Sequence, residues 1–214
     1  MLVLKNYYWF FKGALPPRKC EEIKKAAEQH KKNVAITGAF KNQTKLSKTA
    51  LKQLHKKRKS NVAWMNDPWL YNLILPYIKN ANENAGWNFE FSWSESFQFT
   101  EYKKGQYYGW HQDQNEATYD SPDPNFHGKT RKVSAIIQLT DPKKYKGGDI
   151  EFDFRNSDPE LNKKKTCSFI ACDKGLKQQG TILVFPSFLW HRVKEVTSGT
   201  RHSLVVWNIG WPFK

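Results

Sequence analysis

The hydrophobic pattern of the chain changes at Trp87, and this change limits the folds that the sequence can adopt. Before it, apolar residues recur at helical spacing in residues 18–30 and 69–78. After it come short runs in which apolar and polar residues alternate, as in half-buried strands. These runs are residues 87–93, 95–102, 131–139, 149–154, 180–185, 190–196 and 200–208. Two helices followed by seven or eight strands predict a mainly β, α+β fold, with the helices on one side of a sandwich or barrel.

Local signals add detail to the region before Trp87. Residues 2–10 and 34–37 are predicted to be strands. Asp67 followed by Pro68 is typical of a helix N-cap and the first helical residue. Pro76 is expected to kink or end that helix, because proline lacks the N–H that a helix interior uses.

The charge of the chain indicates an anionic partner or a solvated basic surface. Lys and Arg number 35 against 20 Asp and Glu, which gives a formal net charge of +15. Such an excess attracts polyanions, so nucleic acid and acidic proteins are candidate partners. Residues 41–59 are especially basic. They are predicted to form a helix whose basic face is solvated or contacts a polyanion.

Cysteines and apolar runs bear on the location of the protein. Cys20, Cys167 and Cys172 are an odd number without a CxxC pair, which favours a reducing compartment over a disulfide framework or a zinc knuckle. No secretory leader is recognisable, and no apolar stretch reaches 18 residues. We expect a cytoplasmic protein without a membrane partner, and the sequence leaves its oligomeric state open.

Candidate ligands for a metal ion lie in two separate parts of the strand region. His111 and Asp113 are two positions apart in residues 102–113, so both side chains project from one face of an extended chain. His191 begins a later strand, after a turn that contains Pro186. Two histidines and one carboxylate, without cysteine, match the facial triad of non-haem Fe(II) oxygenases, which leaves three coordination positions open.

Arg201 is the candidate partner of an anionic co-substrate. A 2-oxo acid that chelates iron has a second, distant carboxylate, and arginine offers a permanent charge and a forked donor for it. Alternation along residues 200–208 places on one face Arg201, Ser203, Val205 and Trp207. His127, in a loop, and His202, on the opposite face of the strand, are not expected to be metal ligands.

In chain order, these motifs resemble the Fe(II)/2-oxoglutarate dioxygenases of the prolyl 4-hydroxylase superfamily, and in particular the PKHD-type hydroxylases. The resemblance is carried by Tyr102-x-x-Gly105-x-x-Tyr108-x-x-His111-x-Asp113, Gly147-Gly148-Asp149, Phe185-Pro186-Ser187, His191 and Gly199-Thr-Arg201-x-Ser203. It implies a double-stranded β-helix, or jelly roll, with N-terminal helices packed on one sheet. Residues 1–214 would form a single domain, in which residues 1–86 are the helical support and residues 87–214 the catalytic core.

The same resemblance implies the cofactors and their contacts. Fe(II) would be held by His111, Asp113 and His191, with 2-oxoglutarate and O2 as co-substrates and ascorbate as reductant. Arg201, a fourth catalytic residue, would share the far carboxylate of 2-oxoglutarate with Tyr102. Further cofactor contacts would be Ser203, Gln138 and Trp207, and residues 131–139 would line the pocket through Ser134, Ile136 and Gln138. Candidates for the substrate side are Tyr108, Trp110 and Gln114.

The implied reaction is hydroxylation of a C–H bond coupled to conversion of 2-oxoglutarate to succinate and CO2. Retention of Asp113 favours hydroxylation over halogenation. A prolyl residue in a protein or peptide is the leading substrate, ahead of a lysyl residue or a small molecule.

Two alternative functions remain. One is a non-catalytic jelly-roll binding module. The other is oxidative demethylation of nucleic acid, whose family members carry a second arginine where this chain has Trp207. Residues 114–130 and 155–179 form long loops that could act as lids.

Overall fold

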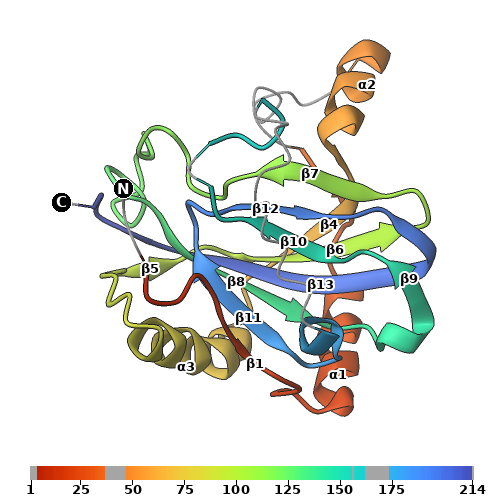
Figure 1. The fold of residues 1–214 in the computed structure, drawn as a ribbon, viewed down its shortest axis with the longest axis horizontal. Coiled ribbons are helices and arrows are strands. Elements are labelled where there is room, and N and C mark those ends of the chain that lie inside the picture. Colours follow the sequence, from red (N-terminus) through yellow and green to blue (C-terminus); the bar gives the residue numbers. More distant parts are fainter. Residues whose placement is uncertain (1–3, 37–46, 156, 162–173, 214) are drawn as a thin grey trace.

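Two antiparallel β-sheets face each other in the computed structural model, which describes residues 4–36, 47–155, 157–161 and 174–213 (Figure 1). The larger sheet has the order β1 (Trp9–Phe11), β11 (Ile182–Pro186), β8 (Thr130–Gln138), β13 (Val196–Gly210), β6 (Phe97–Lys103), β4 (Asn61–Met65) and β2 (Asn33–Val34). Two short strands also pair with β13, namely β5 (Trp93–Ser94) and β9 (Tyr145–Gly147). The smaller sheet has the order β10 (Ile150–Asp153), β12 (Trp190–Val193), β7 (Tyr107–His111) and β3 (Arg58–Lys59). The predicted jelly roll is confirmed.

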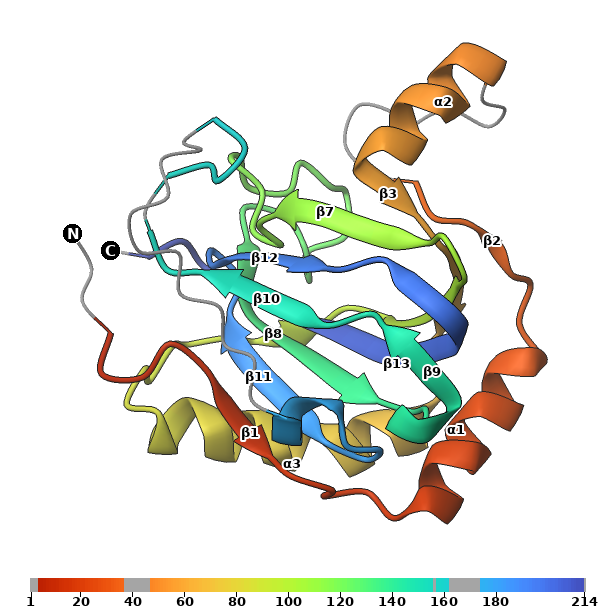
Figure 2. The same cartoon turned by 45° about the vertical axis from the view of Figure 1, so that its right-hand side comes forward.

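Helices cover one face of the larger sheet, and this explains why its strands are so apolar. α1 (Pro17–Glu28) and α3 (Pro68–Asn84) lie against the face that points away from the smaller sheet (Figure 2). Their buried side chains join those of β4, β6, β8, β11 and β13 in one hydrophobic cluster. A second cluster lies between the two sheets and includes Tyr102, Phe152 and Phe185. Most positions of β6 and β8 are therefore buried on both faces.

α2 (Lys48–Lys57) is placed differently from the other two helices. It projects from the body beside β3 and β7 (Figures 1 and 2). Ser47 caps its first turn by accepting a hydrogen bond from the N–H of Ala50 at 3.1 Å. Leu54 is its one fully buried side chain, so little of this helix contributes to the core. Among the described residues, short 3-10 helices are formed by Pro142–Lys144 and Lys174–Lys177.

Pro76 does not end α3, although the sequence predicted a kink or an end there. The helix begins as expected, with Asp67 at the N-cap and Pro68 as first residue, and it runs on to Asn84. Pro76 is exposed, so the carbonyl left unpaired four residues earlier can bind water. Buried Ile78 and Ala81 continue the apolar face beyond it. Packing against the sheet thus outweighs the local cost of proline.

The predicted strand at residues 87–93 is wrong, despite its alternating pattern. Asn88 has a left-handed φ of 51°, which interrupts an extended chain. The side chain of Asn82 takes both backbone groups of Phe89, accepting from its N–H and donating to its carbonyl at 3.0 Å each. Side-chain burial still alternates, because Trp87 and Phe89 pack on the core, but only Trp93 and Ser94 form a strand.

Smaller differences concern the ends of elements. Among the described residues of the predicted strand 2–10, only Trp9 and Phe10 are in β1, because Tyr8 stacks on Phe152 at 5.7 Å instead of extending the pairing. Leu2 and Val3 lie outside the described residues. The strand predicted at residues 34–37 is Asn33–Val34, and Thr37 lies outside the described residues. Also outside them lie Cys167, Cys172 and the lysine run within residues 162–173. In the described part of the chain, no helix is long and apolar enough to cross a membrane.

Replacing Pro76 with alanine is expected to stabilise the protein by about 1–3 kcal/mol, because alanine restores the missing hydrogen bond in an exposed helix interior. Urea denaturation measures this change, and the exposed substitution Lys79→Ala on the same helix should stay within about 0.5 kcal/mol of the parent. A less stable Pro76→Ala protein would show that proline is needed for the course of α3.

Candidate active site

The pairing of β12 with β7 brings the three predicted metal ligands together. His191 lies directly opposite His111 in this pair. Asp113 follows β7, and its N–H donates to the carbonyl of Ser187 at 2.9 Å, which ties it to the turn before β12. Nε2 of His191 is 3.5 Å from Oδ2 of Asp113, and Nε2 of His111 is 3.7 Å from Oδ1. Two ligands of one ion at about 2.1 Å lie at most about 4.2 Å apart, so these groups fit a shared metal ion.

Backbone carbonyls fix which ring nitrogen of each histidine can bind a metal. Nδ1 of His111 lies 2.8 Å from the carbonyl of Gly109, and Nδ1 of His191 lies 2.9 Å from the carbonyl of Leu189. A carbonyl only accepts, so both Nδ1 atoms carry the proton and donate it. Both Nε2 atoms therefore present a lone pair towards Asp113, which is the arrangement that metal-binding histidines use.

The charges of the triad suit a divalent cation. The pKa of His111 lies well below its usual value, mainly because burial desolvates the imidazole and to a smaller extent because His191 is nearby. This imidazole is therefore neutral near pH 7. Burial alone would raise the pKa of the Asp113 carboxyl, but His191, His111 and Arg131 lower it below its usual value. His191 is 3% exposed and Asp113 7% exposed. The result is a buried carboxylate beside two imidazole lone pairs, which is the donor set expected for iron.

A bulge in β7 turns Tyr108 towards the same pocket as His111. The register shifts between His191 and Val193, so two residues of β7, Gly109 and Trp110, lie opposite one of β12, Arg192. Tyr108 and His111 consequently face the same side although they are three positions apart, and their rings stack at 3.5 Å. Trp110 instead packs under Arg192, whose guanidinium carbon is 4.6 Å from the indole.

The larger sheet supplies the opposite wall of the pocket. The predicted inward face of β13 is confirmed, since the pocket is lined from this strand by Arg201, Ser203, Val205 and Trp207. Its other lining residues include Ile136 of β8 and Gln98, Thr100 and Tyr102 of β6. Ser134, Gln138 and Gln114, which the sequence also suggested, are not among them; Gln138 instead lies behind Arg201 as its hydrogen-bond acceptor. Ser134 makes a 2.9 Å hydrogen bond to Ser187 and so supports the turn beside Asp113.

Arg201 is a buried cation without an anionic partner among the described residues. It is 1% exposed, and its partners are neutral: Nη2 donates to Oε1 of Gln138 at 3.0 Å, and Nη1 to Oγ of Ser203 at 3.4 Å. Nε has no hydrogen-bond partner. The Tyr102 ring centre lies 5.4 Å from the guanidinium carbon. A buried charge of this kind is costly unless an anion joins it, so the far carboxylate of 2-oxoglutarate fits this end of the pocket.

Gly148 leaves the space that Arg201 occupies. Its φ is +63°, and a Cβ added to it would lie 2.9 Å from Cδ of Arg201 and 3.1 Å from Cγ2 of Val196. The Gly147-Gly148 motif therefore sets the position of the arginine as well as the turn between β9 and β10.

Arg58 lines the pocket, although no role was predicted for it from the sequence. It is 4% exposed, donates from Nε to Ser60 at 2.9 Å and from Nη2 to Gln98 at 2.7 Å, and lies 4.5 Å from the Tyr108 ring centre. Its position within a run of lysines suggested a solvated side chain. One signal was available, because Arg58 follows Leu54 by four residues and so continues the buried face of α2.

Two other histidines lie away from the triad, as predicted. His202 is on the opposite face of β13, where its Nε2 is 3.4 Å from Glu101. His127 lies in the loop after Asp113 and contacts the carbonyl of Ser121. Among the described residues, the triad is the one cluster of His, Cys, Asp or Glu side chains placed to share a metal ion.

Comparison with known proteins agrees with this geometry. Residues 97–208, more than half of the chain, match the model of the 2OG-Fe(II) oxygenase superfamily. The chain belongs to this superfamily. Its members are enzymes that use Fe(II), 2-oxoglutarate and O2, and the donor set described above is the one they need. The alternative of a non-catalytic binding module is therefore set aside.

Two curated relatives are PKHD-type hydroxylases. That of Pseudoalteromonas atlantica is 30% identical over 112 residues, which are 51% of this chain and 40% of the relative. That of Synechococcus sp. is 32% identical over 96 residues, 44% of this chain and 37% of the relative. The matched part of the oxygenase thus spans less than half the length of either relative. The predicted likeness to PKHD-type hydroxylases is confirmed over that part.

Solved structures share the fold of the oxygenase along nearly its whole length. A viral collagen prolyl hydroxylase from Paramecium Bursaria Chlorella virus-1 superimposes with a TM-score of 0.60 at 20% identity, covering 96% of this chain and 97% of that one. A prolyl-4-hydroxylase from Pseudomonas putida gives a TM-score of 0.63 at 14% identity, covering 94% and 92%. At such identities the likeness establishes the jelly-roll architecture.

Replacing His111 with alanine is expected to weaken metal binding more than about 100-fold, because even groups outside the ligand shell contribute about 10- to 100-fold. Anaerobic titration with Fe(II), or with Mn(II) followed by electron paramagnetic resonance, measures the affinity and the stoichiometry. The matched control is His202→Ala, which removes a part-buried imidazole from the other face of β13. Equal losses in both variants would contradict the assignment of the ligands.

Replacing Gly148 with alanine is expected to raise the dissociation constant for 2-oxoglutarate about tenfold, since a strained φ and a displaced Arg201 together cost about 1–3 kcal/mol. Calorimetry on the Mn(II)-loaded protein measures this constant. Gly86→Ala is the control, because Gly86 has a similar φ of +74° and no atom within 4 Å of its added Cβ. If both variants bind 2-oxoglutarate like the parent, Gly148 does not position the arginine.

Proposed function

We propose that this oxygenase hydroxylates a C–H bond of a prolyl residue in a protein or peptide and releases succinate and CO2. The observation that carries the proposal is one pocket with a buried His111–Asp113–His191 triad and a buried Arg201 that lacks an anion. The prolyl substrate is supported by the functions of structural relatives. These include a Trichoplax adhaerens prolyl hydroxylase in complex with a hypoxia inducible factor peptide, with a TM-score of 0.60 at 14% identity.

The residues of the chain divide the work within the pocket. Fe(II) held by the triad supplies the oxidising chemistry when O2 and 2-oxoglutarate are bound. Arg201, with Tyr102, Gln138 and Ser203 around it, binds and orients the far carboxylate of 2-oxoglutarate. Apolar side chains of Ile136, Val193 and Val205 line the space between the sheets. They exclude water from the reacting groups.

The wall of the pocket at the Gln98 end of β6 is suited to a ring-shaped substrate. Trp64 is paired with Gln98 across β4 and β6, and it is 46% exposed. Its ring lies 6.1 Å from that of Trp207, which lines the pocket. The two indoles, whose planes are inclined at 46° to each other, offer apolar faces to a pyrrolidine ring. We therefore assign the prolyl side chain to this end and 2-oxoglutarate to the Arg201 end.

Trp207 also bears on the nucleic-acid alternative. In the position where nucleic-acid demethylases of the family carry a second arginine, this chain has an indole covered by Arg131 at 3.8 Å. Arg131 is itself neutralised by Glu95, to which its Nη2 donates at 2.6 Å. The cation next to Trp207 is thus already paired with a carboxylate, which favours peptide hydroxylation over demethylation of nucleic acid. Ascorbate as reductant and a cytoplasmic location belong to the same proposal.

Incubation of the Fe(II)-loaded protein with 2-oxoglutarate, O2, ascorbate and a library of proline-containing peptides tests the proposal. We expect peptides that gain one oxygen atom and an equal amount of succinate, both detected by mass spectrometry.

Arg201→Gln should lower kcat/KM for 2-oxoglutarate by about 10- to 100-fold, because a charge-assisted hydrogen bond contributes about 1.5–3 kcal/mol. Lys79→Gln, an exposed substitution on α3 outside the pocket, is the control. Succinate formation without any oxidised prolyl peptide would refute the substrate and leave the oxygenase chemistry standing.

A further inference from the structure

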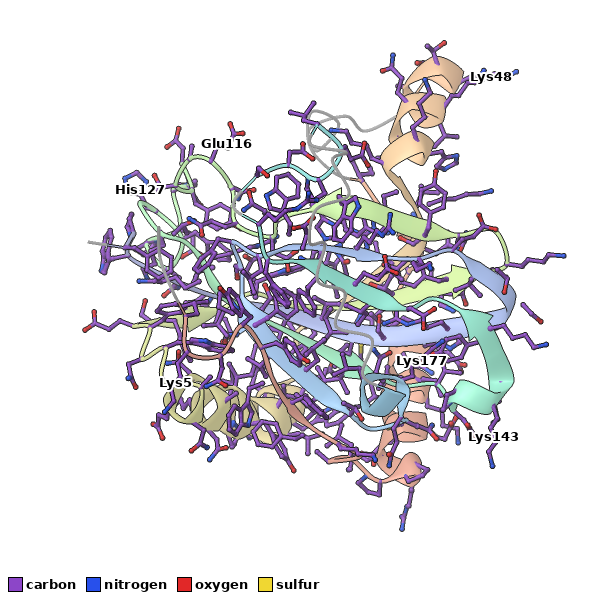
Figure 3. All side chains as sticks on the ribbon, viewed as in Figure 1. Lys5, Lys48, Glu116, His127, Lys143 and Lys177 are labelled. Carbon is purple, nitrogen blue, oxygen red and sulfur yellow. The ribbon has the colours of Figure 1, made fainter. Side chains whose placement is uncertain are left out.

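In one continuous part of the chain, all Lys, Arg, Asp and Glu positions are occupied by Lys or Arg. Residues 29–66 contain ten Lys and Arg side chains and no Asp or Glu. Within this part, Lys48, Lys52 and Lys56 are four residues apart in α2, so they lie along one face of the helix. All three are exposed, and none forms an ion pair with a described residue. We call these three residues the lysine stripe. Figure 3 shows Lys48 at the free end of the helix, far from the sheets.

The lysine stripe is unfavourable for an isolated helix. Like charges four residues apart destabilise a helix, whereas solvated surface helices usually alternate acidic and basic side chains. α2 has ten residues, none of them acidic, and one fully buried side chain, Leu54, so neither charge pairing nor packing offsets the repulsion well. An anionic partner along the stripe would remove this cost.

The helix that carries the lysine stripe leads directly to the active site, with the stripe on the side of α2 opposite the buried Leu54. α2 continues into β3, where Arg58 lines the pocket, and β3 pairs with β7, which carries His111. The hydroxyl of Tyr107 on β7 donates to the carbonyl of His55 at 2.7 Å, which fixes this end of the helix to the sheet. Ten helical residues extend about 15 Å, the length of about five residues of an extended peptide.

We propose that the lysine stripe docks an acidic segment of the protein substrate, and this inference rests on the proposed function. The segment would hold several Asp or Glu side chains within about five residues, a few residues away from the prolyl residue in the pocket. An extended peptide is favoured over single-stranded nucleic acid, since sites for the latter combine basic grooves with aromatic platforms for the bases. α2 contains no Trp, Tyr or Phe.

The inference is tested first by binding, without iron or 2-oxoglutarate. Fluorescein-labelled prolyl peptides carry a block of five glutamates or, as the matched control, five glutamines. Anisotropy should show tighter binding of the glutamate peptide at low salt and a loss of that preference as NaCl is raised. In the combined variant K48Q, K52Q and K56Q, affinity for the glutamate peptide should fall about tenfold, because three exposed ion pairs together strengthen binding by up to about tenfold.

A second combined variant controls for net charge. K5Q, K25Q and K79Q remove the same three charges from exposed lysines that form no described ion pair and lie outside the α2 region. This variant should bind the glutamate peptide within about twofold of the parent. Far-UV circular dichroism and melting curves verify that both variants are folded. Equal losses in both variants, or no preference for glutamate over glutamine in the parent, would overturn the inference.

Turnover then tests the spacing and the class of partner. With the glutamate block placed at increasing distances from proline, kcat/KM should be highest when a few residues separate them, and this maximum should vanish in the K48Q, K52Q and K56Q variant. Tighter binding of an oligothymidylate than of the glutamate peptide, lost in the same variant, would overturn the peptide partner. Absence of succinate formation by the parent would contradict the proposed function, whereas the anisotropy result stands independently of it.

Discussion

The site depends on the pairing of β7 with β12 in the smaller sheet. This pairing places His191 opposite His111, and the carbonyl of Ser187 then accepts from the N–H of Asp113 at the end of β7. A slip of one residue would turn one imidazole to the other face of the sheet and separate the ligands. Ser187 is buried and is itself held by Ser134 of the larger sheet at 2.9 Å. The two sheets thus fix the triad jointly.

Uncompensated positive charge is the second property of the pocket. Arg58 and Arg201 are both buried, and both donate only to neutral side chains among the described residues. Arg131, close by, has its charge balanced by Glu95. Burying two such cations costs stability. The protein accepts this cost where an anionic co-substrate is expected to bind, and a polar network that lacks its ligand is typical of a functional site.

Much of the site was predictable because it depends on the alternation of side chains along a strand, which is the same in any extended segment. His111 and Asp113 share a face through strand alternation, and Arg201, Ser203, Val205 and Trp207 do so along β13. The bulge that turns Tyr108 inward could not be predicted, since it arises from pairing with β12. The apolar alternation of residues 87–93 predicted a strand that the Asn82 side chain prevents. Pro76 and Arg58 show the same limit: tertiary packing decided the course of α3 and the burial of a side chain within a basic run.

The most direct test of the central claim is anomalous X-ray diffraction at the iron edge, on crystals prepared without oxygen with Fe(II) and 2-oxoglutarate. The account predicts one iron peak between Nε2 of His111, a carboxylate oxygen of Asp113 and Nε2 of His191, at about 2.0–2.2 Å from each. It also predicts that the far carboxylate of 2-oxoglutarate contacts the guanidinium of Arg201. Iron at any other place, or 2-oxoglutarate bound with its far carboxylate away from Arg201, would contradict it.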